Sequence, residues 1–130
     1  MASAVRVISM AMRLIWLLNL ALGVYIAFIA VGNTRPWVIT HVFTGVLIVI
    51  LVWFLGIAQA LVKGGSLVLT SATFGVGLAL AIIGASQIAA EGIGLYILQA
   101  LHVILVLSAI ALGELSAARY QKGAAAAQAA

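Results

Sequence analysis

The stretches WVITHVFTGVLIVILVWFLGIAQALV, residues 37–62, and IGLYILQALHVILVLSAIALGEL, residues 93–115, decide the fold of this chain. Each is apolar over more than the roughly 20 residues that a helix needs to cross about 30 Å of hydrocarbon. Each also contains one histidine, His41 in the first stretch and His102 in the second. An imidazole in hydrocarbon is costly unless it has a partner, so both histidines are candidate functional residues.

The composition places the whole chain in a membrane. Of its 130 residues, 67% are hydrophobic and only 6% are charged, whereas roughly a quarter of a soluble domain is charged. The charged residues fall between or near the ends of the apolar runs, so the formal charge of +4 indicates membrane topology and no nucleic-acid partner. The absence of cysteine excludes disulfides, thiolate metal sites and covalently attached haem.

Four membrane spans are predicted, at residues 14–31, 37–62, 67–90 and 93–115. Turn-forming or polar residues at 32–36, 63–66 and 91–92 separate them. Because backbone polar groups in hydrocarbon must pair within the chain, and no span alternates as a barrel strand does, the spans are expected to be helices. The short connections predict an all-α membrane protein, an up-down-up-down bundle of four transmembrane helices.

The basic residues predict the orientation of the bundle. If the N-terminus is cytoplasmic, only Arg35 of the basic residues lies outside, which satisfies the positive-inside rule. Both termini are then inside. The expected parts are a cytoplasmic lead-in at 1–13, a four-helix transmembrane domain at 14–122 and a disordered alanine-rich tail at 123–130. We expect a multi-pass protein of the cell membrane, specifically a prokaryotic plasma membrane.

The two halves of the chain share a pattern that links the histidines. At an offset of 61 residues, Gly23 matches Gly84 and His41 matches His102, so that Gly-x17-His-Val occurs twice. The pattern predicts an internal two-helix repeat whose copies are related by rotation about the membrane normal. The two histidines would then face each other across that axis.

We predict that the histidines hold a haem iron. With a rise of 1.5 Å per residue, His41 and His102 lie roughly 6 Å and 13 Å from the outer ends of their helices. A pair of imidazoles on one metal ion has ligand nitrogens about 4 Å apart. Gly23 and Gly84, about 12 Å from the outer ends of their helices, would leave room for the porphyrin, and Arg35 would pair with its propionates.

Plainer interpretations exist for each of these residues. The histidines could hydrogen-bond between helices, or serve another cofactor or an ion path, although zinc is disfavoured because no cysteine or nearby carboxylate completes a four-ligand set. Arg35 could simply end a span. Thr40 or Thr44 could accept a hydrogen bond from a histidine ring, or could bond to its own helix.

A separate expectation concerns Glu114, which lies about 18 Å from His102 along the same helix. A role in proton handling is disfavoured. We expect it to be an interfacial charge paired with Arg119 or Lys122.

The four spans and the two histidines resemble one half of the haem A synthase family. Each half of that family holds a b-type haem between a histidine on its second helix and one on its fourth. The matching positions here are His41, in Thr40-His41-Val42, and His102, in Leu101-His102-Val103. The catalytic half of the family also has a glutamate one turn before the second-helix histidine, where this chain has Trp37 and Val38. The resemblance therefore implies haem b and electron transfer, and disfavours oxidation of the haem.

The expected function is that of a small b-type cytochrome, for which electron transfer is favoured over catalysis and catalytic activity stays open. Its expected partners are the lipid bilayer and a redox partner or quinone, and a homo-oligomer or a larger membrane complex stays open. A small transporter of the four-helix multidrug type is one alternative. It is disfavoured because transporters of that type resemble one another in a glutamate inside the first helix, and residues 14–31 contain no acidic residue. A cofactor-free accessory or assembly subunit is the other, and it would pack through small residues such as Gly45, Gly56, Gly75 and Gly77.

Overall fold

The chain forms four α-helices in a computed structural model that describes residues 2–29 and 34–129. The helices are α1 (Ala2–Phe28), α2 (Arg35–Ala60), α3 (Leu67–Ser86) and α4 (Gly92–Gln128). All four are long and apolar enough to cross a membrane. The predicted bundle of four transmembrane helices is confirmed, and the chain is a multi-pass membrane protein.

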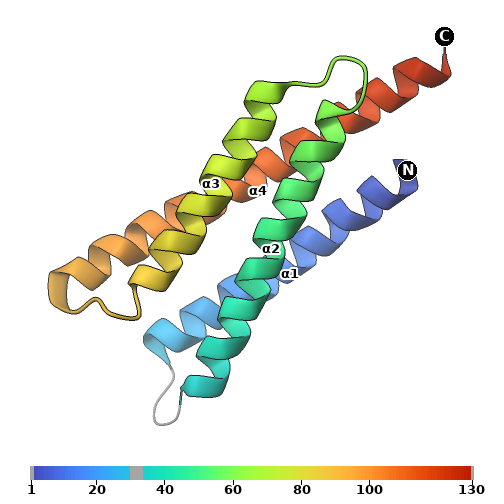
Figure 1. The fold of residues 1–130 in the computed structure, drawn as a ribbon. Helices are drawn as coiled ribbons and strands as arrows, with labels where there is room; N and C mark the ends of the chain where they lie inside the picture. Colours follow the sequence, from blue (N-terminus) through green and yellow to red (C-terminus); the bar gives the residue numbers. More distant parts are fainter. Residues whose placement is uncertain (1, 30–33, 130) are drawn as a thin grey trace.

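The helices run alternately up and down (Figure 1). Both termini lie at the same end of the bundle as the turn between α2 and α3. Each helix packs on the next one in the chain, and α4 also packs on α1 and α2, whereas α1 and α3 do not touch within the described residues. Helices α2 and α4 therefore form the central pair, and these are the two helices that carry the histidines.

The buried core lies in the half of the bundle that contains the termini. Its largest fully buried apolar side chains are Val5 and Met12 of α1 and Val52 and Leu55 of α2. In contrast, neither residues 35–47 of α2 nor residues 92–108 of α4 include a buried residue. The half of the bundle that contains the histidines is therefore loosely packed.

A buried amide joins α2 to α3 at the turn between them. Gln59 is fully buried, and its Nε2 donates to the carbonyl of Ser66 at 2.7 Å and to Oγ1 of Thr70 at 2.9 Å. Its Oε1 accepts from the backbone N–H of Ser66 at 3.0 Å. Ser66 caps α3 by accepting from the N–H of Leu69. Because these bonds satisfy both ends of the amide, the polar side chain holds the turn at little cost.

Glu114 binds Arg13, so the expected pairing with Arg119 or Lys122 is wrong. The Nε of Arg13 donates to Oε1 of Glu114 at 2.8 Å, and Nη2 of Arg13 contacts Oε2. Ser9, one turn before Arg13, also donates to Oε1, at 3.3 Å. The local spacing on α4 suggested a partner on the same helix, but the packing of α1 on α4 supplies one from the other end of the chain.

The first and last helices, α1 and α4, are longer than the sequence boundaries predicted. Residues 2–13, expected as a lead-in, belong to α1, and residues 123–128, expected as a disordered tail, continue α4. The first segment buries Val5, Ser9 and Met12. The second begins at Gly123, which lies against the backbone of the α2–α3 turn. Packing at these points, together with the high helix propensity of alanine, explains the extensions.

Two glycines allow α2 and α3 to approach closely. A Cβ added at Gly56 of α2 would lie 2.1 Å from Oγ1 of Thr73, and one added at Gly77 of α3 would lie 2.3 Å from Nε1 of Trp53. The ring of Trp53 stacks on Phe74 with centroids 4.9 Å apart. A side chain at either glycine would force the two helices apart.

We therefore predict that Gly56→Ala lowers the free energy of unfolding by about 1–3 kcal/mol, the usual cost of overpacking a core. Gly75→Ala on α3 is the matched control, because an added Cβ there meets nothing within 4 Å, and it should be neutral or slightly stabilising. Denaturant titration in detergent micelles measures both. Equal stability of the two variants would show that the close approach at Gly56 is absent.

Candidate functional site

The two histidines lie side by side between the central helices. The ring centroids of His41 on α2 and His102 on α4 are 6.3 Å apart, and the ring planes are inclined by 46°. Both rings are partly buried. The pairing of α2 with α4 thus brings together two residues 61 positions apart in the sequence.

The orientation of His41 is set by the backbone of α1. Its Nδ1 lies 3.2 Å from the carbonyl oxygen of Asn19. A carbonyl oxygen can only accept, so Nδ1 carries the proton and, in the neutral ring, Nε2 is left with a free lone pair. The hydroxyls of Thr40 and Thr44 instead donate to carbonyls of α2, those of Pro36 and Thr40, each at 2.9 Å. Of the two roles that the sequence left open for these threonines, the structure shows the bond to their own helix. The carbonyl of Asn19 was not predicted as the partner of His41.

A glycine lies against each histidine ring. A Cβ added at Gly23 of α1 would be 3.0 Å from Cε1 of His41, and one added at Gly84 of α3 would be 3.2 Å from Cε1 of His102. The same contact therefore occurs in both copies of the Gly-x17-His pattern. The two glycines were expected to leave room for a porphyrin. In the structure, the space beside each glycine is filled by the neighbouring histidine ring instead.

Two buried polar atoms at the site have no hydrogen-bond partner in the described structure. These are Nδ1 of His102 and Oδ1 of Asn19, whose side chain is only 7% exposed. An unpaired polar atom away from water costs free energy. Such atoms in a folded protein call for an explanation, such as a bound group or a functional role.

Arg35 is the first residue of α2 and is exposed. It precedes His41 by six residues, which corresponds to about 9 Å along the helix axis. The start of α2 lies at the end of the bundle away from the termini (Figure 1), in the half that contains the histidines. Arg35 is the only basic residue at this end of the helices in the described chain.

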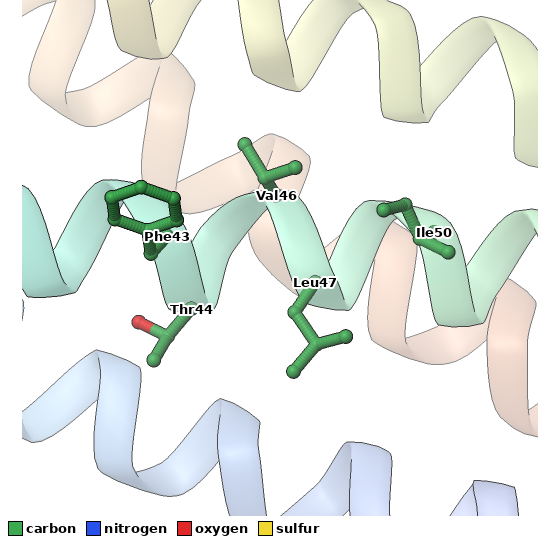
Figure 2. Close-up of a pocket in the computed structure, with 5 residues that line it drawn as sticks. All are labelled: Phe43, Thr44, Val46, Leu47 and Ile50. Atoms are coloured by element: carbon green, nitrogen blue, oxygen red, sulfur yellow. The ribbon is translucent and has the colours of Figure 1, made fainter.

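The surface hollows near the site are apolar. One lies between α1 and α2, where Tyr25 and Trp37 meet edge to face with centroids 5.5 Å apart. The other is formed by α2 alone, and Figure 2 shows the residues that line it: Phe43, Thr44, Val46, Leu47 and Ile50. Neither hollow is lined by a His, Asp, Glu or Cys side chain.

The described residues contain no group of three or more His, Cys, Asp or Glu side chains that could hold a metal ion. A site built from protein ligands alone, such as structural zinc, needs about four. A haem iron needs at most two, because the porphyrin nitrogens supply the others. The two imidazoles alone are too few to hold a bare ion in this way.

Comparison of the chain with protein-family models, with curated proteins and with solved structures finds no match in any of the three. Its function must be inferred from the chemistry of its own residues.

The approach of the two histidines can be tested without any cofactor, because the chain has no native cysteine. We predict that a short bifunctional thiol reagent links the two cysteines of a His41→Cys/His102→Cys variant within one chain. The control is His41→Cys/Val103→Cys, since the next residue on a helix points about 100° away and Val103 is exposed. Intact mass spectrometry measures the linked fraction. Equal linking in both variants would contradict the observed arrangement.

Proposed function

We propose that this chain is a small b-type cytochrome of the cell membrane, in which His41 and His102 bind the iron of one haem b. The observation that carries the proposal is the 6.3 Å separation of the two histidine rings between the central helices. The surrounding membrane would be a prokaryotic plasma membrane.

The ring separation is compatible with both histidines holding one iron. With metal–nitrogen bonds of about 2 Å, the two ligand nitrogens lie about 4 Å apart, and the ring centres, each about 1 Å further out, lie about 6 Å apart. The bond from Nδ1 of His41 to the carbonyl of Asn19 leaves Nε2 as the ligand atom. Metal-binding histidines generally use their second nitrogen in this way.

The loose packing around the histidines supports the proposal. A porphyrin is a broad apolar ring that needs space between helices, and residues 35–47 and 92–108 contain no buried side chain. The well-packed core lies in the other half of the bundle. Arg35, at the open end of α2, would pair with the haem propionates, since guanidinium groups bind carboxylates well.

The role of the chain is to hold the iron and to keep water away from it. A haem held by His41 and His102 would supply one-electron transfer. Residues of this chain would fix both ligands, orient His41 through Asn19 and surround the ring with apolar helices. Electrons would come from, and pass to, a membrane quinone or a partner subunit. Trp37 and Val38 stand where a catalytic glutamate occurs in the resembling family, which favours a carrier over an enzyme.

The alternative of a cofactor-free accessory subunit draws less support from the glycines than the sequence suggested. Gly56 and Gly77 are used within the chain, and Gly45 lies against the side chain of Asn19. Gly75 alone of the four meets nothing within 4 Å. A partner helix would therefore find one open glycine on α3 and no continuous small-residue face made by these four.

An absorption spectrum tests the proposal. We predict that protein expressed with ample haem and purified in detergent shows sharp Soret and α bands when reduced. His41→Ala and His102→Ala should each reduce bound haem by about tenfold or more, because each removes an iron ligand. Thr40→Ala is the control: Thr40 is next to His41 but bonds to its own helix, so the bands should persist.

A colourless wild-type protein under these conditions would contradict the proposal. So would full retention of haem by either histidine variant, because the iron would then have other ligands.

A further inference from the structure

In each half of the chain, the glycine that touches the histidine is preceded by a carbonyl one helical turn away. Asn19 lies four residues before Gly23 in α1, and Leu80 lies four residues before Gly84 in α3. In an α-helix, such a carbonyl accepts the N–H of the residue four positions later. A carbonyl oxygen has two lone pairs, so it can accept a second hydrogen bond.

The first half of the chain makes this second bond. The carbonyl of Asn19 accepts from Nδ1 of His41 at 3.2 Å. The ring can come this near to α1 because residue 23 has no side chain: an added Cβ would be 3.0 Å from Cε1 and 3.6 Å from Nδ1 of His41. Cε1 is bonded to Nδ1, so a methyl group that pushes on Cε1 also moves the donor nitrogen away from the carbonyl.

The second half has the same contact but lacks the bond. An added Cβ at Gly84 would be 3.2 Å from Cε1 and 3.5 Å from Nδ1 of His102, nearly the values of the first half. Nδ1 of His102 is buried and has no partner. At the 61-residue offset, the carbonyl of Leu80 is the counterpart of the carbonyl of Asn19.

We propose that Gly23 is a positioning residue that selects the tautomer of His41. It lets the imidazole reach the carbonyl of Asn19, which accepts the Nδ1 proton and leaves Nε2 to bind. His102 makes the same contact with Gly84 but not the bond, so the inference concerns His41 alone. This inference deepens the proposed function, because it specifies which nitrogen of His41 binds iron.

The effect of a glycine substitution on the tautomer can be separated from its effect on stability. Alanine is a better helix former than glycine, so Gly23→Ala does not weaken α1 by itself. It does push on a ring that is held by one hydrogen bond. The expected result is a helix that still forms, with a histidine that has lost its preference for a proton on Nδ1.

The test is ¹⁵N NMR of the protein labelled in its histidines and purified without haem at a pH where both rings are neutral. The ring nitrogen shifts distinguish a protonated from an unprotonated nitrogen. We expect wild-type His41 to carry its proton on Nδ1 and Gly23→Ala to move that proton towards Nε2. Gly75→Ala should not change His41, because nothing lies within 4 Å of its added Cβ. Haem affinity should fall about 10–100-fold in Gly23→Ala, as for other groups that orient metal ligands.

The outcomes separate this inference from the cytochrome proposal. A wild-type His41 with its proton on Nε2, or a tautomer of His41 that is unchanged in Gly23→Ala, would overturn the inference, and the first of these results needs no variant to fold. A tautomer that shifts as expected in a protein that binds no haem would support the role of Gly23 and reject the cytochrome. Haem binding with an unchanged tautomer would support the cytochrome and reject the role of Gly23.

Discussion

Hydrocarbon cannot hydrogen-bond, so every polar group in a membrane-spanning chain must find its partner inside the protein. Most of this structure follows from that constraint. The backbone is helical, and the hydroxyls of Ser86 and Ser108 return to carbonyls four residues earlier. The amide of Gln59 is satisfied by the turn that it holds. The carboxylate of Glu114 is paired across helices with Arg13.

Among the described residues, the exceptions to this rule are five buried side-chain atoms: Nε1 of Trp16, Nε1 of Trp53, Oγ of Ser116, Oδ1 of Asn19 and Nδ1 of His102. The last two belong to residues at one site. That site lies in the half of the bundle where α2 and α4 contain no buried residue. What distinguishes it is that it also brings two imidazoles together.

The sequence alone was sufficient for the four helices, because the length and hydropathy of each span leave no other structure in a membrane. The Gly-x17-His repeat also predicted the residues that meet at the site. It could not predict that the glycines contact the histidine rings, nor that a backbone carbonyl orients His41, because both depend on how closely α1 approaches α2. The partner of Glu114 was missed for a similar reason, since Arg13 lies on a helix distant in sequence. The extra turns of α1 and α4 were missed because the packing that supports them, such as Gly123 on the α2–α3 turn, is not a local signal.

The central claim is that two imidazoles of one chain bind one iron. Iron K-edge absorption and low-temperature electron paramagnetic resonance of the purified, oxidised protein test it directly, with the haem content per chain measured on the same sample. The account predicts one low-spin iron per chain, with six nitrogen ligands of which two are axial imidazoles. A high-spin or five-coordinate iron, an axial ligand other than imidazole, or a protein that takes up no haem would contradict it.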